Sequence, residues 1–283
     1  MTRVIPLCNG FVDPACPINW DHPLNYGLVA DWTVTPNPGW RGGLALRDLV
    51  RGGKNPNDGT RTNGPTWISG GRPGGFGALR GNGTNTRVVI GTATALQLTS
   101  AFSVSGWLRT TNTGTKVLVG FYNPAAGSGF GLAIGVNAAG KPDFYDGVGW
   151  RGCSSTINSG TWRHLAAVYT GAAVSFYIDA ALVNSPAAST VTAYSGSKSL
   201  LANADGSNFF WADDADAIAF HNRALTAQDV QAFYLETKAG NPTRWNWADT
   251  GRRVWAVSAA PVIIQPYEFV QSLPVDTIVR YPY

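Results

Sequence analysis

Short stretches of alternating large apolar and small or polar residues run through the middle of the chain. Residues 130–136 (FGLAIGV) and 174–179 (VSFYID) show the pattern most clearly. An alternation with a period of two is typical of β-strands. Gly, Asn and Pro residues separate these stretches, so we predict many short strands arranged as an all-β sandwich or jelly roll.

The period changes once, in the run 213–234 (DDADAIAFHNRALTAQDVQAFY). Its first half predicts a half-buried strand, with Ile218 and Phe220 on one face. Thr226 then fits a helix N-cap, and Asp229 three residues later completes a capping-box pattern. We therefore predict one short C-terminal helix. Its apolar stripe and closing signals are Val230, Phe233, Tyr234, Lys238 and Gly240.

Both flanks of the strand-rich region differ from it. Prolines keep residues 1–23 irregular or extended, and residues 238–283 are apolar with prolines that forbid a long helix or a central strand. We predict an N-terminal arm at 1–23, a sandwich at 24–237 and an apolar C-terminal arm for assembly at 238–283. The arm residues expected at an interface are Trp245, Trp247, Trp255, Ile263, Tyr267, Phe269 and Tyr281.

The composition of the chain argues against some classes of binding partner. Only 13% of residues are charged, and the net charge of +4 is scattered, which argues against nucleic-acid binding. No apolar run approaches the roughly 20 residues that a membrane helix needs. The N-terminal residues lack the apolar core of a signal peptide, which predicts synthesis in the cytoplasm without export.

Cysteine and histidine give no zinc pattern. The three histidines lie far apart in the sequence and no C-x-x-C pair occurs. Cys8 and Cys16 could close a small loop if the protein ends up outside the cell, or could remain incidental thiols like Cys153. Whether they form a disulfide stays open at this point.

Catalysis has little support in the sequence. Glycoside hydrolases use two carboxylates, and the only two glutamates, Glu236 and Glu268, lie in the predicted helix and in the C-terminal arm. Asp214 and Asp216 could share a strand face, but the strand runs directly into the helix. His164 has no nucleophile constellation around it, so a structural, hydrogen-bonded role is favoured. We expect no enzymatic activity.

Six segments, in order, resemble the LamG-like domains of the concanavalin A-like lectin/glucanase superfamily, and the 213–234 run resembles the end of such domains. The resemblance implies a concanavalin A-like jelly roll. The segments are 27–32 (GLVADW), 46–49 (LRDL), 72–85 (RPGGFGALRGNGTN), 102–108 (FSVSGWL), 162–169 (WRHLAAVY) and 175–179 (SFYID).

Such domains often bind calcium at the sandwich rim, and the resemblance makes Asp213, Asp214, Asp216 and Asn85 the candidate ligands. Asn and Thr stand in residues 81–86 where the family has Asp, which removes negative charge. No tightly bound cofactor is therefore expected.

Glycan binding is the second implication, because exposed aromatic rings stack on sugars and the chain has 11 Trp. The resemblance assigns Trp32, Trp107 and Trp162 to packing. The loop candidates for a glycan site are Trp40, Trp67, Trp150 and Trp211. Aromatic residues are also common at protein interfaces, so this signal does not separate the two kinds of partner.

Residues 22–30 (HPLNYGLVA) and 72–79 (RPGGFGAL) resemble LamG-domain structural proteins of tailed bacteriophages. This resemblance implies a non-enzymatic virion protein, either a capsid decoration or a tail-associated protein. Its arms would dock on other virion proteins and on further copies of itself. The alternative is a carbohydrate-binding module for surface glycans, and a glycoside hydrolase or depolymerase is the third reading.

Overall fold

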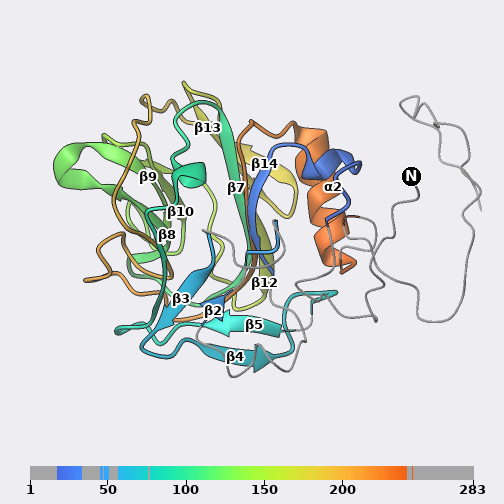
Figure 1. Ribbon diagram of the computed structural model, residues 1–283, viewed down its shortest axis with the longest axis horizontal. Coiled ribbons are helices and arrows are strands. Elements are labelled where there is room, and N and C mark those ends of the chain that lie inside the picture. The colour runs from blue at the N-terminus through green and yellow to red at the C-terminus, as the bar shows by residue number, and fades with distance from the viewer. Residues whose placement is uncertain are drawn as a thin grey trace, which may run out of the picture. The chain divides into compact units, whose positions relative to one another are not determined.

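In the computed structural model the described residues are 18–33, 45–46, 48–50, 57–75, 77–240 and 244. They form two antiparallel sheets packed as a β-sandwich, with one short helix after the last strand (Figure 1). The chain divides into two compact units, Met1–Thr250 and Gly251–Tyr283, and all described residues belong to the first. The predicted all-β jelly-roll sandwich with one C-terminal helix is confirmed.

The first sheet has the strand order β14-β13-β12-β7-β16-β5-β4, and β1 also pairs with β16. Its centre is formed by β7, β12 and β16, which pair over long registers. The pairing of β1 with β16 places the two ends of the chain's strand-rich region side by side. The strands are β1 (Leu28–Trp32), β4 (Thr66–Ser69), β5 (Gly77–Arg80), β7 (Phe102–Arg109), β12 (Trp162–Tyr169), β13 (Val174–Ile178), β14 (Ala181–Asn184) and β16 (Asp214–His221).

The second sheet has the order β11-β10-β9-β8-β15-β6-β3-β2. Its strands are β2 (Ala45–Leu46), β3 (Gly59–Thr62), β6 (Arg87–Gly91), β8 (Lys116–Asn123), β9 (Ser128–Ile134), β10 (Pro142–Tyr145), β11 (Trp150–Gly152) and β15 (Lys198–Leu200). Within the described residues, three single turns of 3-10 helix connect elements of the fold: η1 (Pro23–Asn25), η2 (Thr94–Leu96) and η3 (Pro124–Ala126).

The core lies between the sheets and is rich in aromatic rings. The Phe102 ring is 4.5 Å from that of Phe130 and 5.1 Å from that of Tyr169, and Phe121 stacks on Phe220 at 5.2 Å. These side chains come from alternate positions of five strands, which is why the period-two pattern predicted the sandwich.

Helix α2 (Ala227–Lys238) covers the outer face of the first sheet (Figure 1). The predicted capping box is confirmed, because the Thr226 side chain accepts from the Asp229 amide and Asp229 accepts from the Thr226 amide. Trp107 Nε1 donates to Thr237 Oγ1 at 2.9 Å and fixes the end of the helix to the sheet. None of the described helices is long and apolar enough to cross a membrane.

Strand β16 differs from its prediction as a half-buried strand. Ile218 and Phe220 do share the sandwich core, but every residue of β16 is buried. The cause is α2, whose Phe233 packs over Ala219 on the opposite face. The register also shifts between Asp216 and Ala219.

The segment before β1 packs against the same side of the sandwich as α2. Ile18 and Leu24 are buried in a cluster with Phe233. Arg244 reaches this segment from beyond the helix and is 1% exposed. Its guanidinium is 3.1 Å from the Asp31 carboxylate, so residues on both sides of the strand-rich region meet in one buried polar cluster.

Candidate functional site

A layer of aromatic side chains covers part of the outer face of the second sheet. The Tyr122 ring on β8 lies 4.9 Å from that of Tyr145 on β10 and 5.6 Å from that of Trp150 on β11. Gly131 on β9 makes room for it, since a Cβ there would lie 2.8 Å from the Tyr122 ring. Glycine at this position therefore lets the tyrosine ring lie close to the sheet.

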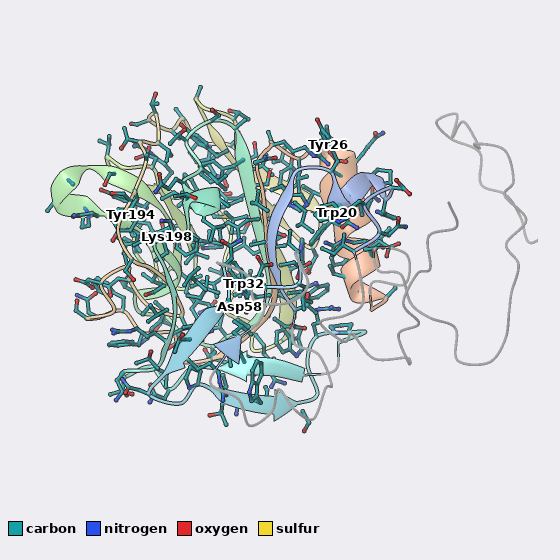
Figure 2. The ribbon with its side chains drawn as sticks, in the orientation of Figure 1. Trp20, Tyr26, Trp32, Asp58, Tyr194 and Lys198 are labelled. Carbon is teal, nitrogen blue, oxygen red and sulfur yellow. The ribbon has the colours of Figure 1, made fainter. Side chains whose placement is uncertain are left out.

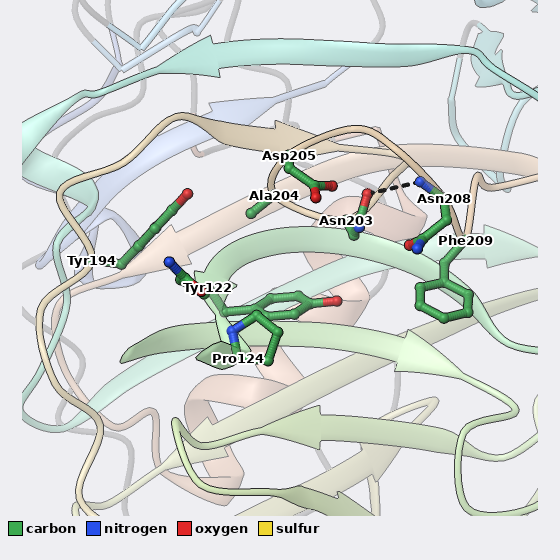
Figure 3. A pocket seen from close by; sticks show the side chains of 9 residues that line it. Tyr122, Pro124, Tyr194, Asn203, Ala204, Asp205, Asn208 and Phe209 are labelled. Atoms are coloured by element: carbon green, nitrogen blue, oxygen red, sulfur yellow. Dashed lines mark hydrogen bonds between the residues drawn. The ribbon is translucent and has the colours of Figure 1, made fainter. Parts of the chain in front are cut away.

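A cavity of about 310 Å³ opens beside Tyr122. The loop after β15 lies across from the ring and brings polar side chains to the same space (Figure 3). A volume near 300 Å³ is at the lower end of the range for small-molecule sites. The lining residues are Tyr122, Asn123, Pro124, Tyr194, Asn203, Ala204, Asp205, Asn208 and Phe209.

The loop that carries the polar groups is held by its own hydrogen bonds. Asn203 Oδ1 accepts from the backbone amides of Ser207 at 3.0 Å and Asn208 at 3.2 Å. Asp205 Oδ1 accepts from the amide and the hydroxyl of Ser207 at 3.0 and 2.8 Å. Arg87 donates to the Gly206 carbonyl from the second sheet. These contacts fix the positions of the amide and carboxylate groups before any ligand arrives.

Phe209 ends this loop in an unusual conformation. Its φ is +53°, in the left-handed region that bulky residues rarely adopt, yet 45% of the side chain is exposed. The Phe209 carbonyl accepts from the Val117 amide at 2.8 Å, which anchors the backbone to β8. Strained residues of this kind cluster at ligand sites. An exposed ring held in this way points to a contact surface.

Tyr122 supplies a polar group to the cavity. Its side chain is largely buried, and it lines the cavity. Burial raises the pKa of Tyr122, and the Asp205 carboxylate raises it further. Burial and then Asp205 also raise the pKa of Tyr194. Both phenols are therefore protonated near neutral pH. The Tyr122 hydroxyl is able to donate to a ligand, whereas the Tyr194 hydroxyl already donates to the Ser197 carbonyl at 3.1 Å.

The site combines two kinds of group. Phe209 and Pro124 offer exposed apolar surface, while Asn203, Asn208 and Asp205 offer amide and carboxylate groups. Sugars have apolar ring faces and polar hydroxyl edges, so this combination matches their chemistry. A cavity that is mostly apolar with few fixed polar groups is the usual form of a small-molecule site.

The four tryptophans predicted for glycan binding do not gather at one place. Trp150 is half-buried and belongs to the aromatic layer next to the cavity, although it does not line the cavity. Trp67 lies on β4 of the other sheet, under the guanidinium of Arg61 at 5.0 Å. Trp40 lies outside the described residues.

Trp211 needs a correction, because its side chain is 0% exposed and packs in the main core. Its backbone amide donates to the Leu201 carbonyl at 2.9 Å, which draws this loop residue inward. A buried ring cannot stack on a sugar.

The carboxylates predicted for calcium are engaged elsewhere. Asp214 is 2.6 Å from both Arg80 and Arg109, and the buried Asp216 is 3.0 Å from Arg72. The described residues contain no group of three or more His, Cys, Asp or Glu that could hold a metal.

The two other candidate calcium ligands, Asp213 and Asn85, also bind protein groups. Asp213 accepts from the Thr110 hydroxyl at 2.5 Å and from the Thr111 amide at 3.1 Å. Asn85 is exposed and accepts from Asn82 at 2.9 Å. The structure therefore does not assemble Asp213, Asp214, Asp216 and Asn85 into a calcium site.

His164 is structural, as predicted, but not through hydrogen bonds. Both ring nitrogens lack a hydrogen-bond partner in the described part of the chain, and the ring packs against Trp107 at 5.5 Å and Tyr234 at 5.8 Å. Burial lowers the pKa of His164 to about 3, so the ring is neutral. Of the two glutamates, Glu236 lies in α2, and Glu268 lies outside the described residues.

Several predictions fall on residues that the structure does not describe. They are the assembly-arm residues Trp245, Trp247, Trp255, Ile263, Tyr267, Phe269 and Tyr281, and the cysteines Cys8 and Cys16. The third cysteine, Cys153, is buried and free.

The lining residues Tyr122, Tyr194, Asp205 and Phe209 were not predicted from the sequence. A signal was present in residues 203–209 (NADGSNF), a turn-forming stretch that ends in an aromatic residue. Only the folded structure shows that this stretch lies beside Tyr122, which is far away in the sequence.

Comparisons with known structures agree with this architecture. The chain is similar to the binding domain of Paraclostridial Mosquitocidal Protein 1, with a TM-score of 0.57 and 16% identity over 75% of this chain and 52% of that one. It is also similar to a Trypanosoma rangeli sialidase in complex with sialic acid, with a TM-score of 0.56 and 15% identity over 84% of this chain and 37% of that one. At these identities the likeness shows the fold alone.

The chain thus spans about half of the first structure and little more than a third of the second. No curated protein matches it by sequence. A family model described as the concanavalin A-like lectin/glucanases superfamily matches residues 82–231, just over half of the chain. The protein belongs to the concanavalin A-like lectin/glucanases superfamily.

Proposed function

We propose that the protein is a non-enzymatic carbohydrate-binding protein and that the cavity beside Tyr122 is its binding site. The observation that carries the proposal is Phe209, an exposed ring fixed in a strained backbone conformation at the mouth of a polar and aromatic cavity. Membership of a superfamily that includes lectins supports it.

Binding without catalysis fits the groups that line the cavity. Glycoside hydrolases generally need two carboxyl groups on either side of the scissile bond. Asp205 is the single carboxylate among the lining residues. The site can therefore hold a sugar, and it lacks the usual pair of groups that would cleave one.

A glycan array tests the proposal. The purified protein should bind a defined subset of glycans, and the Phe209→Ala variant should bind them about three- to tenfold more weakly. Fully burying a Phe side chain gains roughly 1.5–3 kcal/mol, and because Phe209 is 45% exposed a ligand can gain about half of this.

Trp20→Ala is the matched control. Trp20 is 54% exposed and lies on the α2 side of the sandwich, away from Tyr194 (Figure 2). This variant should bind like the wild type. An empty array, or equal losses in the two variants, would remove the cavity as a glycan site.

An assembly role is the second candidate, and the apolar, proline-punctuated composition of residues 238–283 favours it. We propose that this segment docks on other copies or on other proteins of a particle. A tailed-bacteriophage virion is the setting that the sequence resemblance implies. Glycan binding and assembly are compatible, since they use different residues.

Sedimentation velocity tests the assembly role with the full chain and a chain that ends at Thr250. The truncation retains Arg244, whose removal would disturb a buried ion pair. The full chain should form oligomers and the truncated chain should be monomeric. A monomeric full chain would contradict self-assembly, and its absence from purified particles by mass spectrometry would contradict the virion setting.

A further inference from the structure

The side chains that line the cavity beside Tyr122 carry negative charge and no positive charge. Of its nine lining residues, Asp205 is the only one with a charged side chain, and the others are aromatic, amide, proline or alanine residues. No arginine or lysine lines the cavity to receive an acidic group. Arg is the side chain best suited to bind carboxylates and sulfates, because its planar group donates two parallel hydrogen bonds.

The carboxylate has a fixed position. Ser207 holds Oδ1 of Asp205 with two hydrogen bonds, while the residue as a whole remains exposed. The field of Asp205 reaches both phenols of the cavity, because it contributes to raising the pKa of Tyr122 and of Tyr194. A ligand in contact with these rings therefore experiences the same negative charge.

Two cationic groups that contact this part of the fold do not line the cavity. Arg87 donates to the Gly206 carbonyl, and Lys198 donates to the Gly196 carbonyl at 3.3 Å. The Lys198 nitrogen is 5.5 Å from the centre of the Tyr194 ring, but the lysine is buried.

We propose that this cavity selects neutral sugars and discriminates against sugars that carry a carboxylate or sulfate, because Asp205 accepts hydrogen bonds from hydroxyl groups and repels anions. This inference rests on the proposed glycan-binding function. Sugar hydroxyls donate to Oδ2 of Asp205 and to the side-chain oxygen of Asn208, since Asn203 Oδ1 already accepts from two backbone amides. The carboxylate or sulfate of an acidic sugar accepts hydrogen bonds rather than donating them, and it adds a like charge beside Asp205.

The expected loss of affinity for an acidic sugar follows from the distance between its charge and that of Asp205. Two unit charges about 5 Å apart in a water-exposed site repel enough to weaken binding roughly fivefold. Screening by salt reduces this repulsion, since the Debye length is about 8 Å at physiological ionic strength. The discrimination should therefore shrink as salt is added.

The test measures binding of paired glycans that differ by one acidic group: the methyl ester of sialyllactose and sialyllactose itself, and N-acetyllactosamine and its sulfated form. The wild type should bind the neutral member of each bound pair about fivefold more tightly at low salt. Asp205→Asn keeps an oxygen for Ser207 and removes the charge, so the ratio should fall below about twofold. Asp21→Asn, at an exposed carboxylate outside the cavity, should leave the ratio unchanged.

The outcomes separate the two claims. Equal or tighter binding of the acidic members by the wild type overturns the selectivity while the glycan-binding function stands. The same holds if Asp205→Asn does not change the ratio. If Asp205→Asn fails to fold, the salt series on the wild type decides, and a ratio independent of salt overturns the proposal. If no glycan binds, both the proposed function and this inference fail.

Discussion

Replacing Arg244 with methionine should destabilise the sandwich strongly, although Arg244 lies beyond the last helix. Its guanidinium is 3.1 Å from Asp31, with both side chains 1% exposed, and Nε donates to Asn25 Oδ1 at 3.0 Å. The guanidinium carbon lies 4.3 Å from the centre of the Phe233 ring. These contacts tie the segment before β1 to α2.

The size of the loss in stability follows from the Asp31 carboxylate, which Arg244→Met leaves buried without its ion-pair partner. Without Arg244, the Asp31 carboxylate keeps, among the described residues, the 2.6 Å hydrogen bond from the Thr33 hydroxyl. Removing one member of a buried ion pair costs about 3–5 kcal/mol. Methionine fills much of the vacated volume, so the loss should lie within this range. Domains have free energies of unfolding of about 5–15 kcal/mol, so the loss is a large fraction of the total.

Urea unfolding monitored by tryptophan fluorescence measures this cost. Arg163→Met is the matched control, since its pair with Asp179 spans 2.7 Å but the side chains are 39% and 29% exposed. Such exposed pairs contribute about 0–1 kcal/mol. The double variant Arg244→Met with Asp31→Asn should recover a large part of the loss, because it removes the stranded charge. If Arg244→Met unfolds within about 1 kcal/mol of the wild type, the buried pair is not what holds these segments together.

Three other outcomes are expected. His164 is neutral when folded, because burial lowers its pKa to about 3, whereas the unfolded chain binds a proton as pH falls below about 6.5. The wild type therefore loses stability as pH falls through that value, and His164→Leu should lose about 1.4 kcal/mol less per pH unit in urea titrations; an unchanged slope would contradict a neutral histidine. Thr226→Ala should cost about 1 kcal/mol in thermal unfolding by removing the helix cap, and an unchanged melting temperature would argue against the cap. Calcium at about 1 mM should leave the melting temperature unchanged, whereas a rise reversed by EGTA would show that Asp214 and Asp216 are available to metal despite their arginine partners.

Local patterns in the sequence were enough to predict the fold class. The period-two alternation predicted strands, and Thr226 with Asp229 predicted where the helix begins. Both signals act over a few residues, so they need no knowledge of the rest of the chain. The complete burial of β16 was not predictable in this way, because it depends on α2 folding back over the sheet.

The ion pairs required the strand register. Asp214 lies opposite Arg80 on one neighbouring strand and Arg109 on the other, so one carboxylate receives two guanidinium groups. In sequence these residues are more than 100 positions apart. From the sequence alone, the aspartates of residues 213–216 were therefore candidate metal ligands. The strand register shows that Asp214 is paired with arginines instead.

For the proposed glycan site, the sequence predicted the kind of residue but not its position. Aromatic residues were expected at the site, but Trp211 is drawn into the core. Close packing accompanies this, because a Cβ on Gly81 would lie 2.0 Å from the Trp211 carbonyl oxygen. The cavity instead uses Tyr122, Asp205 and Phe209. Composition shows that aromatic residues are plentiful, and only the tertiary structure shows which rings are exposed.

Amide chemical shifts of nitrogen-labelled protein, recorded while a neutral glycan from the array is added, test glycan binding at the cavity most directly. The account predicts that the shifts change for Asn123, Ala204 and Phe209, which line the cavity, and that Trp20 stays unaffected. Changes clustered around Trp67 on the other sheet, or no changes at saturating glycan, would contradict it.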